Sequence, residues 1–254
     1  KSEKIELVAK KVDQLFALTK LTGAYDNNAQ QAEYHNINKA IRGKSVEEIE
    51  LAFNEIIVRH FNDRGLPITD YSEIFQYKHF KNASIDSRFT KYILARVDYF
   101  LASILNEHSP TKQDSLYFIT HSGTSPVNGY HTEHMYSYND KIMNQFVDSD
   151  GEYDENLFYS ERERLGALLL LKGNENIRTS NWVYSRKRKS YRNSGFLWNR
   201  ILTGDINPAS LNNCKHTIKR EFKTYEPLTG GVLEVEAIEE RQKLLFKIIK
   251  EIYS

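Results

Sequence analysis

Apolar residues recur at three- and four-residue steps along most of the first 107 positions, which is the period of an amphipathic helix. This pattern predicts helices over residues 2–19, 28–41 and 85–106. A further helix is predicted to begin at Ser45, because Ser45 and Glu48 have the spacing of a capping box, and to end at Gly65. We therefore expect residues 1–107 to form a helical domain.

The pattern changes after position 108. Short apolar runs predict strands over residues 115–120, 130–135 and 168–171. Asn128-Gly129 has the sequence of a hairpin turn, a polar helix is predicted to end near Arg164, and another helix is predicted to start near Asn174. The order strand, strand, helix is the outline of a ββα-metal site with an insertion, and we assign it to a domain of residues 108–205.

The tail, residues 206–254, contains one more amphipathic helix, predicted over 232–253. We expect it to pack back on the helical domain. The predicted fold class is therefore α+β, mostly α, with a helical bundle followed by a small domain that holds two strands.

Composition narrows the class of protein. The chain has 254 residues, of which 40% are hydrophobic and 27% charged, a balance typical of folded globular domains. No apolar run approaches the roughly 20 residues that a membrane-spanning helix needs. The single cysteine, Cys214, excludes an internal disulfide and a zinc ribbon, so a reducing cytoplasm is the expected compartment. The net charge of +1 means that any binding of a polyanion must depend on local clusters of charge.

Candidate chemistry lies in the second domain. Hydrolysis of a phosphodiester needs a base to generate hydroxide and a cation to neutralise the charge that builds up on the phosphate. His134 is the best candidate for the base, Glu133 offers a carboxylate oxygen, and Asn176 offers an amide oxygen. Oxygen ligands of this kind suit Mg²⁺ or Mn²⁺ better than Zn²⁺. A Glu-His pair is weak evidence by itself, but the ordered series of residues downstream of it is specific.

The series resembles the HNH domain known as DUF1524, which is found at the C-terminus of GmrSD-type modification-dependent restriction enzymes and related phage-defence nucleases. Glu133-His134-Met135 matches the first element of that pattern, Gly166-Ala167-Leu168 matches the second imperfectly, and Glu175-Asn176 matches the third. The spacing of the fourth element is matched by Tyr184, Lys187, Tyr191 and Ser194. The specific motifs fall within about residues 130 to 195, while the resemblance covers most of the chain.

The resemblance implies that His134 is the general base and that Glu133 and Asn176 are ligands of one divalent metal. Lys187 and Tyr191 would lie near the substrate or brace the site. Ala167 occupies the place of the family's middle Asn, whose side chain would hold the base imidazole in its productive orientation. This departure is either a natural divergence or an engineered replacement, and in both cases we expect weakened cleavage.

His131 precedes the base by three residues on the same predicted strand, so its side chain is expected to point to the opposite face. His131 is a further candidate participant. A local cluster of charge follows Asn176, and we predict that it forms a helix that binds phosphates without sequence specificity. Its candidate DNA-binding residues are Arg186, Lys187, Arg188, Lys189, Tyr191 and Arg192.

The sequence thus predicts a metal-dependent DNA endonuclease that forms the effector part of a modification-sensing restriction or antiviral defence protein. The resemblance implies DNA, such as modified phage DNA, as the partner, and a DUF262-like NTP-using module N-terminal to this region. The alternative is a catalytically impaired DNA-binding or regulatory module of the same fold, with Ala167 as its signature. A third alternative is that the helical region is a scaffold for a homo-oligomer.

Overall fold

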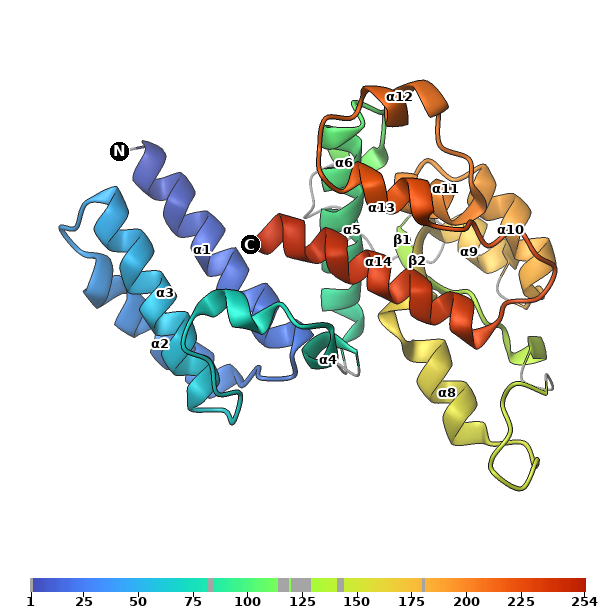
Figure 1. Cartoon of the computed structure of the whole chain (residues 1–254), viewed down its shortest axis with the longest axis horizontal. Helices are drawn as coiled ribbons and strands as arrows, with labels where there is room; N and C mark the ends of the chain where they lie inside the picture. The colour runs from blue at the N-terminus through green and yellow to red at the C-terminus, as the bar shows by residue number, and fades with distance from the viewer. Residues whose placement is uncertain (1, 82–84, 114–118, 120–128, 141–143, 180) are drawn as a thin grey trace. The chain divides into compact units, whose positions relative to one another are not determined.

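The computed structural model describes residues 2–81, 85–113, 119, 129–140, 144–179 and 181–254. The described chain is mostly helical and contains a small sheet of two strands (Figure 1). It divides into two compact units, one of Lys1–Ile85 with Tyr253–Ser254 and one of Asp86–Ile252. The predicted class, mostly α with a minor β part, is confirmed at this level.

The first unit is helical throughout its regular elements, which are α1 (Ser2–Leu21), α2 (Asn27–Ile41), α3 (Val46–Asn62), the 3₁₀ turn η1 (Tyr71–Ile74) and α4 (Tyr77–Phe80). The predicted capping box forms at the start of α3. The Ser45 hydroxyl accepts from the Glu48 backbone N–H at 3.2 Å, and the Glu48 carboxylate accepts from the Ser45 N–H at 2.7 Å. The apolar stripe of α3 is buried, as its periodicity predicted.

The second unit contains the two strands and most of the remaining helices. Its elements are α5 (Ser87–Ile104), α6 (Pro110–Gln113), β1 (Tyr130–His134), η2 (Tyr138–Asp140), α8 (Glu155–Glu163), η3 (Leu165–Ala167), β2 (Leu168–Lys172), α9 (Gly173–Thr179), α10 (Tyr184–Arg192), α11 (Leu197–Thr203), α12 (Pro208–Asn213), α13 (Lys219–Thr224) and α14 (Val235–Tyr253).

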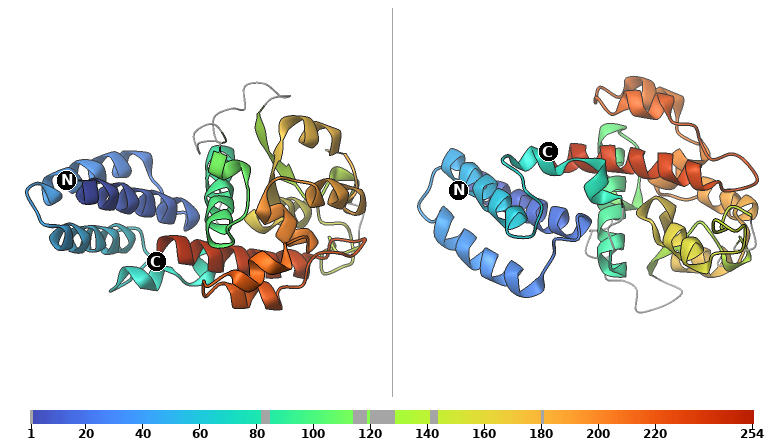
Figure 2. Two further views of the ribbon diagram at one scale, coloured as in Figure 1. Left: turned by 90° about the horizontal axis from the view of Figure 1, so that it is seen from above. Right: turned by 60° about the horizontal axis from the view of Figure 1, so that its bottom comes forward.

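β1 and β2 pair antiparallel, with Tyr130 opposite Lys172 and His134 opposite Leu168. The pair lies between α5 and α9, as the views of Figures 1 and 2 show. The four leucines of β2 are buried, as expected for a continuous apolar run in a covered strand. The strands predicted at 130–135 and 168–171 are therefore confirmed. Most of the strand predicted at 115–120, and Asn128 of the predicted turn, lie outside the described residues, although Ile119 is helical.

α5 belongs to the second unit, whereas the sequence pattern placed residues 1–107 in one helical domain. Asp98 on α5 supplies one reason. Its carboxylate accepts hydrogen bonds from the Trp198 backbone N–H at 2.9 Å and from the Thr111 hydroxyl at 3.0 Å. Burial raises the pKa of this carboxyl group, and these donors compensate for the lost solvation. The buried carboxylate thus joins α5 to the start of α11.

The sequence predicts one amphipathic helix in the tail, residues 206–254. The amphipathic helix predicted there is α14, and within the second unit it contacts the turn η3. Packing of the tail on the helical domain stays a prediction. No helix of the described chain combines the length and the hydropathy that crossing a membrane requires.

Candidate functional site

The candidate site is built around the end of β1, where Glu133 and His134 are neighbours. Successive side chains of a strand point to opposite faces. Glu133 accordingly contacts α10, whereas His134 contacts the end of α8. The two residues therefore lie in different chemical environments despite their adjacency.

Glu133 is buried in a polar cluster. Its Oε1 lies 2.8 Å from the Lys187 ammonium and accepts a hydrogen bond of 2.9 Å from the Tyr191 hydroxyl. The side chains of Glu133 and Lys187 are only 4% and 1% exposed, so the ion pair is shielded from solvent. Burial raises the pKa of Tyr191 well above its ordinary value, and the adjacent Glu133 charge adds to this effect. The phenol therefore keeps its proton and donates.

His134 is partly open to solvent, with 26% of its side chain exposed. Its Nε2 lies 3.0 Å from the Glu163 carboxylate. Burial, assisted by the nearby Arg162 guanidinium, lowers the pKa of His134 below its ordinary value, although Glu163 acts in the opposite direction. The imidazole is thus neutral at physiological pH, and a neutral ring that donates Nε2–H to Glu163 keeps Nδ1 as a proton acceptor.

Asn176 lies on α9, the helix that packs against both strands. Its Oδ1 is buried and has no hydrogen-bond partner within the described part of the chain. A buried amide oxygen in this state costs free energy unless something satisfies it. On β1, His131 Nε2 and Thr132 Oγ1 are likewise buried and have no hydrogen-bond partner among the described residues. His131 and His134 are three positions apart on a regular strand, so they fall on opposite faces, as the sequence predicted.

Ala167 is fully buried in η3, directly before β2. Its carbonyl oxygen accepts from the backbone N–H of Met135, at 2.9 Å, and this bond continues the strand pairing one residue beyond His134. The turn therefore helps to set the position of His134 through the backbone. The carboxylate that holds the imidazole comes from Glu163, not from position 167.

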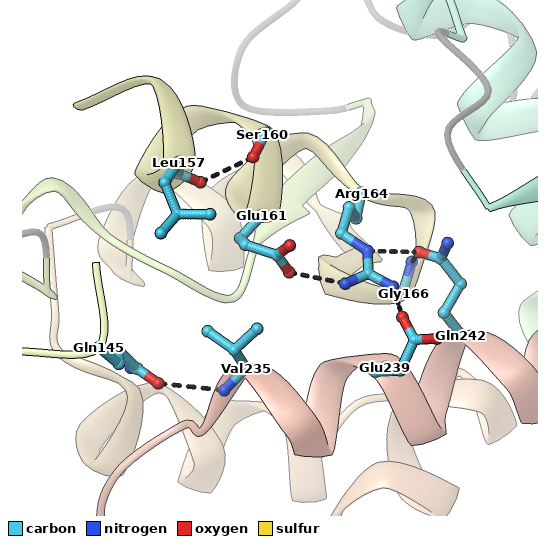
Figure 3. Close-up of polar contacts among 9 residues, drawn as sticks. All are labelled: Gln145, Leu157, Ser160, Glu161, Arg164, Gly166, Val235, Glu239 and Gln242. Carbon is cyan, nitrogen blue, oxygen red and sulfur yellow. Dashed lines mark hydrogen bonds and ion pairs between the residues drawn. The ribbon is translucent and has the colours of Figure 1, made fainter. Parts of the chain in front are cut away.

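The turn is fixed in place by α14 (Figure 3). Gln242 Oε1 accepts from the Gly166 N–H at 3.1 Å and from Arg164 Nε at 3.3 Å. Arg164 also pairs with Glu161, at 2.7 Å, and with Glu239. Gly166 is required because a Cβ atom there would lie 2.7 Å from Gln242 Cβ and 2.9 Å from the Ile238 carbonyl oxygen. The glycine that opens the matched element Gly166-Ala167-Leu168 is thus explained by a close helix contact.

Arg241 of α14 holds the same turn. Its guanidinium is buried, donates to the carbonyl oxygens of Gly166 and, at 3.3 Å, Leu168, and stacks on the Trp198 ring with 4.4 Å to the centroid. Burial lowers the pKa of Arg241 to about 10, so the group stays charged at neutral pH. Gly166 is therefore held through both its N–H and its carbonyl group by consecutive residues of one helix.

The basic run on α10 separates into buried and exposed residues. Lys187 and Tyr191 are predicted to bind DNA and, by the family resemblance, to lie near the substrate or brace the site. In the structure both are buried and brace Glu133. Arg188 donates to the Gly230 carbonyl oxygen at 3.2 Å, and Arg192 lies 3.5 Å from Asp205. Arg186 and Lys189 are exposed and line a pocket between α9 and α10.

Two contributions were missed by reasoning from the sequence. Glu163 lies in a polar helix rich in carboxylates, and no local pattern distinguishes it from its neighbours. The burial of Lys187 did have a signal, because Tyr184, Lys187 and Tyr191 follow the three- and four-residue steps of an inward-facing helix stripe. Among the described residues, no three His, Cys, Asp or Glu side chains are grouped so that they could hold a metal ion.

The chain matches the model of one protein family. Searches among curated proteins and among solved structures found no match. The family model that describes the C-terminal domain of GmrSD restriction endonucleases matches residues 69–248, which is more than half of the chain. Membership indicates a nuclease role in restriction, with DNA as the substrate. The chain belongs to the family of C-terminal domains of GmrSD restriction endonucleases.

Proposed function

We propose that this chain is an HNH-type, metal-dependent DNA endonuclease, and that it is the effector part of a modification-sensing restriction system. One observation carries the proposal beyond family membership. His134, a partly exposed and neutral imidazole at the end of β1, is oriented by the Glu163 carboxylate, and the helix that packs on this strand carries a buried amide oxygen, Asn176 Oδ1, that has no partner among the described residues. A base and a ligand oxygen are the two groups that metal-assisted hydrolysis of a phosphodiester requires.

In this proposal His134 removes the proton from the attacking water at Nδ1. Glu163 accepts Nε2–H and so fixes the tautomer and the angle of the ring. As His134 gains the proton it becomes an imidazolium, and the adjacent Glu163 carboxylate stabilises that charge. Glu163 is therefore a positioning residue.

The metal would be Mg²⁺ or Mn²⁺, held by Asn176 Oδ1 and Glu133. The Asn176 oxygen fits this role because it is buried and lacks a partner among the described residues. The fit of Glu133 is narrower. Lys187 already neutralises its carboxylate and Tyr191 donates to the same oxygen, Oε1, while the side chain is 4% exposed and points to the face of β1 opposite to His134. Glu133 would therefore hold a cation only through its second oxygen, Oε2, beside the Lys187 ammonium. Such an ion, when bound, would neutralise charge on the phosphate during cleavage.

Cleavage of supercoiled plasmid in Mn²⁺ or Mg²⁺, compared with EDTA, tests the proposal. We expect metal-dependent nicking that His134→Ala abolishes, while His108→Ala, which removes an exposed imidazole from the same unit, leaves it unchanged. The same comparison is made in the Ala167→Asn background. If neither background nicks, or if His134→Ala nicks as fast as its parent, the enzyme proposal is rejected.

Metal binding is measured separately from cleavage. Calorimetric titration with Mn²⁺ should show one site that Asn176→Ala weakens by at least tenfold. Asn212→Ala, which removes an exposed amide from α12, serves as the control. Equal affinity in the wild type and the Asn176→Ala variant would remove Asn176 from the ligand set.

The second candidate function is a DNA-binding or regulatory module that has lost cleavage. Ala167 favours it, because a methyl group cannot hydrogen-bond the base. The expected discriminating result is that Ala167→Asn raises the nicking rate while the melting temperature stays near that of the wild type. An unchanged or lower rate in a folded variant would show that position 167 does not orient the base, a role that Glu163 would then fill alone.

A further inference from the structure

A pocket between α9 and α10 is distinct from the His134 site. Its volume is about 330 Å³, at the lower end of the range of ligand sites in proteins, roughly 300–1,000 Å³. Three cations line it, Arg178 from α9 and Arg186 and Lys189 from α10. Glu175 is the single carboxylate in the lining, which leaves a net charge of about +2 by simple count.

Among the described residues, these three cations lack the ion pairs that their neighbours have. On α10 itself Lys187 pairs with Glu133 and Arg192 pairs with Asp205. None of Arg178, Arg186 and Lys189 forms an ion pair with any residue that the structure describes. Like charges that share a concave surface repel one another, and an anion placed between them removes that repulsion. The pocket is therefore complementary to an anionic group.

Trp182 makes the pocket more selective than a patch of surface charge. The Arg186 guanidinium stacks on its ring with 3.8 Å to the centroid. Stacking of this kind fixes the plane of the guanidinium while its N–H groups remain available at the edge. A fork of N–H donors in a fixed plane matches two oxygens of a phosphate. Ser190 and Asn193 add neutral polar groups to the lining.

We infer that this pocket binds a backbone phosphate of the DNA, with its attached sugar, at a position separate from the bond that is cut. The inference rests on the proposed function for the identity of the polyanion. On α9, Arg178 is two residues beyond Asn176, and a helix turns about 200° over two residues. One short helix thus presents a candidate metal ligand on one side and a phosphate-binding cation on another.

DNA binding in EDTA tests the inference without cleavage. Fluorescence anisotropy of a labelled duplex would be measured for Arg178→Gln, Lys189→Gln and their combination. We expect each single variant to lower affinity by about tenfold and to reduce the slope of log K against log salt by about 0.9. Lys215→Gln, an exposed loop cation of the same unit, is the matched control and is expected to bind as the wild type does.

The binding and nicking measurements together distinguish failure of the pocket from failure of the enzyme proposal. Pocket variants that fold, bind DNA as tightly as the Lys215→Gln control and keep its salt slope would overturn the inference, whether or not nicking occurs. Variants that lose affinity in a protein that never nicks would support the pocket and reject the enzyme proposal. Titration with a 5′-mononucleotide and with inorganic phosphate identifies the source of the anion. Tight binding of the free mononucleotide, with DNA affinity independent of Arg178, would assign the pocket to a small ligand and overturn the inference.

Discussion

The ammonium group of Lys187 connects the two neighbouring candidate residues of β1. It lies 2.8 Å from Glu133 Oε1 and donates a hydrogen bond of 2.7 Å to the backbone carbonyl oxygen of His134. A single side chain of α10 therefore neutralises the buried carboxylate and fixes the backbone of the candidate base. Because Lys187 is 1% exposed, neither contact competes with solvent.

Replacement of this lysine by an apolar chain of similar length leaves the Glu133 charge buried without its cation. We expect Lys187→Met to lower the free energy of unfolding by about 3–5 kcal/mol, the range for breaking one side of a buried ion pair. Urea denaturation measures the change. Lys189→Met, at an exposed position of the same helix, is expected to change stability by less than about 0.5 kcal/mol.

The double variant Lys187→Met with Glu133→Gln separates the charge from the packing. Since the glutamine removes the uncompensated charge, we expect it to recover part of the stability that Lys187→Met loses. No recovery would mean that the loss comes from the bond to the His134 carbonyl oxygen and from packing.

The second prediction concerns the close contact between η3 and α14. Gly166→Ala places a Cβ atom 2.7 Å from Gln242 Cβ, so the helix or the turn must shift. Overpacking of this size costs about 1–3 kcal/mol. We also expect lower cleavage, since the turn leads directly into the pairing of Leu168 with His134. Thermal melting and plasmid nicking measure the two effects.

Gly231→Ala is the control for that variant, because a Cβ atom there meets nothing within 4 Å. It should melt at or slightly above the wild-type temperature. Equal melting temperatures and rates for the Gly166→Ala variant and this control would show that α14 does not hold the turn.

The third prediction concerns pH and the first unit. His60 on α3 is buried, and burial lowers its pKa to about 4. The unfolded chain, with a histidine pKa near 6.5, binds the proton more readily than the folded chain does. His60 therefore contributes stability that is fully present above pH 6.5 and is lost as the pH falls toward 4. The loss amounts to about 2 kcal/mol between pH 7 and pH 5.

Urea denaturation of the wild type, His60→Gln and His35→Gln at both pH values checks this linkage. The His60→Gln variant should lose less stability on acidification than the wild type, whereas His35→Gln removes an exposed imidazole and should behave as the wild type does. An identical pH dependence in all three proteins would contradict a buried neutral His60.

Helix formation was predictable wherever one apolar face repeats over several turns. The cap at Ser45 and the inward stripe of α3 follow from local spacing alone, and both form. The run Leu168 to Leu171 predicted a covered strand because an apolar run of this length has no solvent face. These features depend on residues within about ten positions of one another.

The candidate site depends on longer separations. Gln242 meets Gly166 across 76 positions, and Lys187 meets Glu133 across more than 50. Local periodicity carries no information about such pairs. The basic residues around Lys187 therefore predict DNA binding, and only the resemblance to the family offers the alternative that Lys187 braces the site. Similarly, the sequence shows that α8 is rich in carboxylates. It does not show that Glu163 is the one that contacts His134, because that contact depends on how the chain folds back toward β1.

The last prediction tests whether Glu163 orients His134. Glu163→Ala removes the acceptor of the His134 Nε2–H, so the ring can rotate and exchange tautomers. We expect nicking to fall by about 10- to 100-fold, the usual range for loss of a group that orients a catalytic side chain, whereas Glu163→Gln, whose amide oxygen can still accept, should keep more of the rate. Glu152→Ala removes an exposed loop carboxylate and should have no effect.

A structural readout distinguishes orientation from a general change in charge. Long-range ¹H–¹⁵N spectra of the imidazole should show His134 as the Nε2–H tautomer in the wild type and as a mixture of tautomers in Glu163→Ala. The Glu152→Ala control carries the same change in net charge, so its spectrum should match that of the wild type. If Glu163→Ala loses activity while the tautomer is unchanged, Glu163 acts on the substrate or the metal, and the base is held by another group.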